Sequence, residues 1–139
     1  MVRASRLGSI FVALLCLMMD NSPVSAQAID SSLQSIRTAI IQATGVPDAS
    51  LDLKVKGNIF IVSRINSTMN QTNHSARDGE ASRIATAVAK SIADSAAYKN
   101  IHTIRVMYVA TLKPGNQEKV VDTIEFRRDT SGIFHFHAT

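Results

Sequence analysis

Two histidines near the carboxyl end of the chain have the spacing that most directly suggests chemistry. His135 and His137 flank Phe136, and residues two apart on a strand project from the same side. Zn²⁺ and copper sites often use such imidazole pairs, so the pair is a candidate metal site. Further ligands would come from other histidines and carboxylates: His74, His102, Asp122 and Glu125. The favoured alternative is an exposed polar face on a terminal edge strand, where ligands are poorly fixed.

Three arginines on predicted strands form the second candidate site. Arg64, Arg105 and Arg127 would line up if their strands are neighbours in the sheet. A basic stripe of this kind on an open sheet face would attract anionic headgroups or polymers. The alternative is that a half-exposed sheet needs polar residues and that arginine supplies them.

Catalytic patterns are absent from the sequence. Asp78 and Glu80 are two apart, which puts them on different faces of a helix and argues against an acid–base pair. Asp122 lies among apolar strand residues, where a buried carboxylate would be functional, although an exposed strand start or edge is the favoured placement. There is no nucleophile motif and no glycine-rich phosphate loop. The sequence therefore favours a protein that is not an enzyme, with no cofactor.

The N-terminus has the pattern of an export signal. Arg3 and Arg6 precede an apolar run, Leu7–Met19, that is too short to span a bilayer. The small-residue site Val24-Ser25-Ala26 follows, which predicts cleavage between Ala26 and Gln27. The alternative is an uncleaved anchor. Cleavage would remove Cys16 and leave no transmembrane segment, with residues 1–26 as the signal and 27–139 as one domain.

The remaining chain of about 113 residues is long enough for a single core. Removing Arg3, Arg6 and Asp20 from 15 basic and 11 acidic residues leaves a mild net charge of +3. This charge and the export signal argue against a nucleic-acid partner. The expected location is the periplasm or the exterior. Three Asn-x-Ser/Thr triplets, at Asn66, Asn70 and Asn73, are attributed to chance in a polar loop.

The hydrophobic pattern predicts two helices and five strands. The helices cover 29–43 and 75–97, and Asp30 or Ser31 is expected to cap the first. The strands cover 51–56, 59–65, 101–110, 119–128 and 133–137. This order, α-β-β-α-β-β-β, predicts a two-layer α+β sandwich with both helices on one face of an antiparallel sheet.

The region from Leu33 to about Val109 resembles the BON domain of bacterial envelope proteins. The hairpin from Gly57 to Ile65, the alanines of the second helix (Ala81, Ala85 and Ala89) and the strand containing Ile104 and Val106 carry the resemblance. Ser63 stands where the family has a glycine, and the loop from Asn66 to His74 is long. The resemblance implies binding to phospholipid or another envelope component without catalysis.

The first hypothesis is therefore an exported, non-catalytic module that binds anionic lipid, polymer or an envelope protein through its open sheet face. The second is a metal-binding protein or small metal-dependent enzyme using His135 and His137. The third is a subunit that pairs through its C-terminal edge strand, Ile133 to Phe136.

Overall fold

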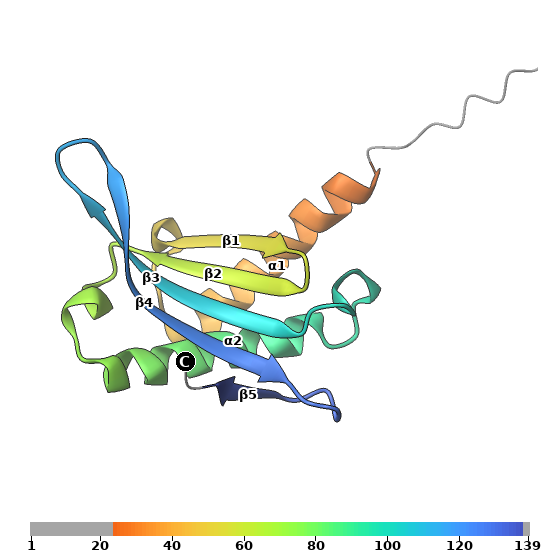
Figure 1. Cartoon of the computed structure of the whole chain (residues 1–139). Coiled ribbons are helices and arrows are strands. Elements are labelled where there is room, and N and C mark those ends of the chain that lie inside the picture. The colour runs from red at the N-terminus through yellow and green to blue at the C-terminus, as the bar shows by residue number, and fades with distance from the viewer. Residues whose placement is uncertain (1–23, 138–139) are drawn as a thin grey trace, which may run out of the picture.

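The computed structural model describes the backbone of residues 24–137 and the side chains of 30–137 (Figure 1). Two helices alternate with five strands in the predicted order: α1 (Val24–Thr44), β1 (Leu51–Lys56), β2 (Ile59–Ile65), α2 (His74–Ile92), β3 (Thr103–Leu112), β4 (Gln117–Arg128) and β5 (Phe134–His137). Short 3₁₀ helices occupy Asp48–Ser50, Thr68–Gln71 and Ala96–Tyr98. The fold is α+β, as the sequence indicates.

Most of the predicted export signal, including Cys16, lies outside the described residues. The predicted cleavage point falls within the first turns of α1 and stays a prediction. Within residues 24–137, no helix combines the length and the apolar character needed to cross a membrane.

The sheet has the strand order β1-β2-β3-β4-β5. Three of its neighbouring pairs are antiparallel and β2–β3 is parallel, so the sheet is mostly antiparallel and differs from the predicted antiparallel sheet at this one pair. The reason is the connection, because a parallel pair needs a crossover and α2 provides it. Both helices lie behind the sheet in Figure 1, so no helix of the described residues covers the other face.

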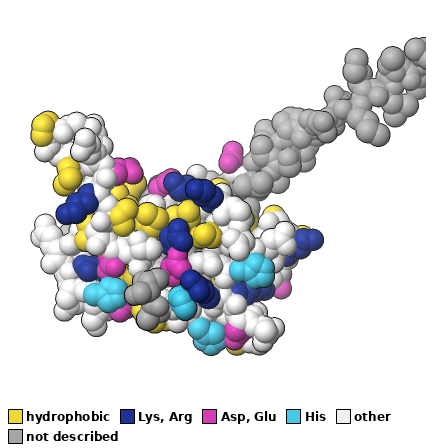
Figure 2. Space-filling model, in the orientation of Figure 1, with side chains coloured by type: hydrophobic (Ala, Val, Ile, Leu, Met, Phe, Trp, Pro, Cys, Tyr) yellow, Lys and Arg dark blue, Asp and Glu magenta, His cyan; other side chains and the backbone are white. Residues whose placement is uncertain are grey.

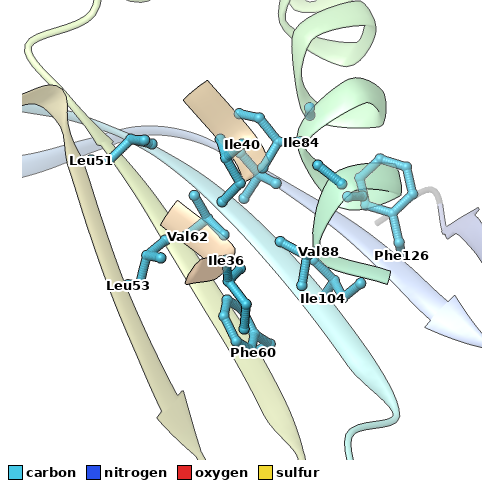
Figure 3. Close-up of a cluster of buried hydrophobic side chains, with 14 of the residues drawn as sticks. Ile36, Ile40, Leu51, Leu53, Phe60, Val62, Ile84, Val88, Ile104 and Phe126 are labelled. Carbon is cyan, nitrogen blue, oxygen red and sulfur yellow. The ribbon is translucent and has the colours of Figure 1, made fainter. Parts of the chain in front are cut away.

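The core lies between the helices and the covered face of the sheet. Ile36 and Ile40 of α1 and Ile84 and Val88 of α2 are almost fully buried (Figure 3). They pack on strand residues that alternate toward the helices: Leu53, Phe60, Val62, Ile104, Val106, Ile124 and Phe126. Each side chain of this size contributes about 1.5–3 kcal/mol when removed from water, so this layer holds the sheet in place.

The ends of the helices agree with the sequence-based predictions at some positions and differ at others. Gly45 has φ 71° and its N–H donates to the Ile41 carbonyl at 2.7 Å, as expected of a glycine after a helix. The expected N-terminal cap at Asp30 or Ser31 is wrong, because α1 already begins at Val24. The second helix ends at Ile92 and not at Ala97, since a 3₁₀ turn brings Tyr98 into the core against Phe60 at a ring-centroid distance of 5.9 Å.

Candidate functional site

The strand register divides the sheet into two faces with different chemistry. On the covered face, two cross-strand rows are apolar. The third row, at one end of the sheet, begins with Leu51 and continues with three polar side chains, which we call the polar row: Arg64, Tyr108 and Asp122. The open face is the opposite one. Its central apolar residues are Ile59, Ile61, Ile65, Met107, Val109 and Val120, which we call the open-face patch.

Figure 2 shows the open face, with hydrophobic side chains gathered over the middle strands and charged side chains of both signs around them. By register, Asp52, Lys54 and Lys56 of β1 flank the patch on one side. Arg105 and Glu125 flank it on the other. Val120 is 48% exposed, whereas Ile61 and Val109 are buried by their neighbours. The open face is therefore an apolar surface with a mixed charged border.

The predicted arginine stripe is not formed. Arg105 and Arg127 lie on the open face, and both pair with the buried Glu125, at 2.6 and 3.5 Å. Arg64 points to the other face and is only 4% exposed, so its placement in the stripe is wrong. The physical reason is strand alternation, because Arg64 shares the side of Phe60 and Val62, and that side is the one the helices cover.

Arg64 instead belongs to a buried ion pair beneath α2. Its Nε donates to Glu80 Oε1 at 2.9 Å. Its two terminal nitrogens donate to the hydroxyls of Ser50 and Ser67. The guanidinium therefore has partners in every direction, which is what a buried charge requires.

Tyr108 connects this pair to the rest of α2. Its hydroxyl lies 3.3 Å from Glu80 Oε1 and 3.0 Å from the Arg77 carbonyl, either of which accepts its proton. Burial, followed by the nearby Glu80 charge, raises the pKa of Tyr108 well above its usual value. The phenol thus stays neutral and acts as a hydrogen-bond donor.

A second ion pair continues the polar row at the start of α2. Arg77 Nε donates to Asp122 Oδ2 at 2.6 Å, and His74 Nδ1 lies 2.7 Å from the same oxygen. Burial opposes ionisation of Asp122, but the hydrogen bonds from Arg77, His74 and the Thr123 N–H outweigh it and lower its pKa. Asp122 is thus the partly buried carboxylate that the sequence analysis considered and did not favour.

The pKa of His74 is raised, first by the hydrogen bond to Asp122 and then by the charges of Asp122 and Asp78. Its Nε2 faces Asp78 at 3.4 Å. Both ring nitrogens therefore face carboxylates, which favours the imidazolium form and not a general base. The cluster is suited to holding α2 on the sheet, and no group in it is poised for acid–base chemistry.

The two C-terminal histidines share the open face, opposite Arg127 and Glu125 in register. His135 Nε2 contacts Asp129 Oδ2 at 2.8 Å. His74 is on the other side of the sheet, beside Asp122, and His102 lies in the segment before β3. Among residues 30–137, no group of three or more histidine, cysteine, aspartate or glutamate side chains is arranged to hold a metal ion. The structure thus gives the metal hypothesis no support.

Sequence reasoning missed Glu80 and Arg77. From the sequence, Glu80 was considered only together with Asp78, and that pair was rejected; in the structure Glu80 is buried and pairs with Arg64. The available signal was the position of Arg64, because an arginine in phase with Phe60 and Val62 calls for a carboxylate on the opposing helix.

No protein-family model matches this chain, and neither the curated proteins nor the solved structures include a significant match. The resemblance to the BON domain therefore stays a prediction.

Proposed function

We propose that this protein is an exported, non-catalytic binding module whose open sheet face contacts an envelope component. The observation that carries the proposal is the one-sided helix layer, which leaves the open-face patch without a covering element among the described residues. Apolar surface patches bordered by polar groups are typical of interaction sites.

The border of the patch favours a protein surface over an anionic lipid or polymer. Arg105 and Arg127 share Glu125, which cancels part of their charge. Asp52, Lys54 and Lys56 lie on the same side of β1, so this border also carries both signs of charge. Charges of both signs around an apolar centre match the arrangement of protein–protein interfaces, in which the rim is polar.

Site-specific photo-crosslinking in the producing cell tests the proposal. A photoreactive phenylalanine analogue replaces Met107 in the open-face patch, and the matched control replaces Arg83, which is exposed on α2. We expect a discrete protein adduct from position 107 and none from position 83. Val120→Asp, which adds a charge to the patch, is expected to reduce the adduct about tenfold.

Liposome co-sedimentation distinguishes the lipid alternative. Binding that requires anionic lipid, weakens with salt and is lost in Arg105→Glu would replace the protein partner with a membrane surface. Equal adducts at positions 107 and 83, or none at 107 together with no liposome binding, would contradict a binding role for the open face.

A further inference from the structure

A groove separates the C-terminal half of α2 from β5, on the covered side of the sheet. Its volume is about 460 Å³. Ala85 and Ala89 of α2 form one wall, Phe134 and Phe136 of β5 form the other, and Phe126 contributes between them. Phe136 is 50% exposed and the neighbouring Ile133 is 58% exposed. The small side chains of α2 and the aromatic rings of β5 thus leave an apolar channel that none of residues 30–137 fills.

The edge strand beside this groove presents its backbone outward. β5 is the last strand in the sheet and pairs with β4 alone among the described strands. The Arg128 N–H donates to the His102 carbonyl at 2.9 Å, toward β3. Because antiparallel strands alternate bonding direction, Arg127 then bonds toward His135, and the N–H and C=O groups of Phe134 and Phe136 point to the free edge.

The groove has a basic side chain at its wall. Lys90 of α2 lines it and makes no ion pair with any residue between 30 and 137. A carboxylate on the occupant would complement this ammonium. A second copy of the chain is a poorer match, because a symmetric contact through β5 would bring a second Lys90 to the same edge of the sheet.

From these three features we propose that the groove binds an extended peptide from a partner protein, which adds to β5 as a sixth strand. Its backbone bonds to Phe134 and Phe136, its alternate apolar side chains enter the groove, and a carboxylate meets Lys90. Main-chain bonds along a sheet edge combined with side-chain pockets beside it are an established mode of peptide recognition. This surface is separate from the open-face patch, so it would be a second binding site.

Fluorescence anisotropy with the full chain and synthetic peptides tests the proposal. The probes are peptides of about six residues with alternating valine and threonine, made in three forms: with a free C-terminal carboxylate, amidated, and amidated with an internal aspartate. We expect at least one carboxylate form to bind about tenfold more tightly than the neutral amide. Tighter binding of the free C-terminal form would show that Lys90 contacts a chain end, and tighter binding of the aspartate form would show that it contacts an acidic side chain.

Two α2 variants serve as the matched pair. Lys90→Ala should remove the preference for a carboxylate, whereas Arg83→Ala, which removes a charge from the same helix outside the groove, should keep it. Equal preference in the two variants would overturn the role of Lys90.

Amide hydrogen exchange measured by NMR tests strand addition itself. Peptide binding should slow exchange at Phe134 and Phe136 and leave His135 unchanged, because that amide already faces β4. Absence of peptide binding, binding without this protection, or a dimer on sedimentation that protects the same amides without peptide would each overturn the proposal.

Discussion

The two halves of α2 meet the sheet in different ways. The N-terminal half carries His74, Arg77 and Glu80, and each of these contacts a charged partner on the sheet. The C-terminal half carries Ala85 and Ala89, which face the groove beside β5. The N-terminal half is joined to the sheet by ion pairs and hydrogen bonds. Beside the C-terminal half, the apolar groove and the outer edge of β5 have no partner among the described residues.

The contrast between the two halves indicates which groups are available to a partner. Charged clusters attract attention as functional sites, but the cluster around Arg64 and Asp122 has its charges paired internally. The surfaces that lack partners within the described chain are apolar: the open-face patch and the groove. Binding is therefore expected at these apolar surfaces and not at the charged cluster.

Removing Glu80 should have the largest effect on stability. Glu80→Ala leaves the Arg64 guanidinium buried without its carboxylate, and a broken buried pair costs about 3–5 kcal/mol of unfolding free energy. Urea unfolding of the variant measures this loss. Glu118→Ala, at an exposed position on β4, is the control and should stay within about 0.5 kcal/mol of the unmodified protein. A loss below about 1 kcal/mol for Glu80→Ala would show that the ion pair does not stabilise this half of α2.

The two buried tyrosines provide a sharper comparison. Tyr108→Phe removes a hydrogen-bonded hydroxyl from the polar row, so it should cost about 1–2 kcal/mol of unfolding free energy. The Tyr98 hydroxyl is also buried but has no hydrogen-bond partner in the part of the chain described, so Tyr98→Phe should be neutral or slightly stabilising. Thermal unfolding of both variants gives the difference. Equal losses would contradict the assignment of these hydrogen bonds.

Replacing Phe136 should separate stability from binding. The ring is half exposed and contacts Phe126 edge-on at 6.0 Å, so Phe136→Thr should lower the unfolding free energy by only about 1 kcal/mol. The same variant should weaken peptide binding more than tenfold, because it removes one wall of the groove. A stability loss as large as that of Glu80→Ala would mean that the β5 edge belongs to the core.

The pH dependence of the His74–Asp122 pair should give the smallest effect. The pKa of His74 is raised above 6.5, so its contribution is complete below that pH and is lost as the pH rises through the folded-state value. The lowered pKa of Asp122 gives a contribution present above pH 3.8 and lost as the pH falls through its folded-state value.

The melting temperature should therefore fall more between about pH 5.5 and about pH 8 in the unmodified protein than in His74→Gln. Identical pH profiles for the two proteins would show that the pair makes no contribution to stability.

The sequence was informative where the pattern was local. Alternation in 51–56 and the Gly57-Asn58 turn placed β1 and β2 correctly, and Gly45 marked the end of α1. Alternation shows which residues share a face, but it does not show which face the helices cover when both are apolar. In β2, Ile59, Ile61 and Ile65 compete with Phe60 and Val62, and this ambiguity misplaced Arg64.

The polar row and its partner Glu80 on α2 could not be predicted, because these residues are distant in the sequence. Arg64, Glu80, Tyr108 and Asp122 meet only after α2 crosses the sheet and β2 pairs with β3. The groove is also a tertiary feature, because Ala85, Ala89 and Phe136 look like ordinary core positions until the helix position is known.

The parallel pair β2–β3 has a consequence for the folding pathway. α1 with the β1–β2 hairpin is continuous in sequence, and so is the β3–β4–β5 meander, so each can form from local contacts. Among the described residues, the β2–β3 ladder and α2 make the main connection between them, and every pair of that ladder, from 59 with 103 to 65 with 109, closes a loop longer than any other pairing in the sheet. Because non-local pairing is slow, we expect docking of these two units to limit the folding rate.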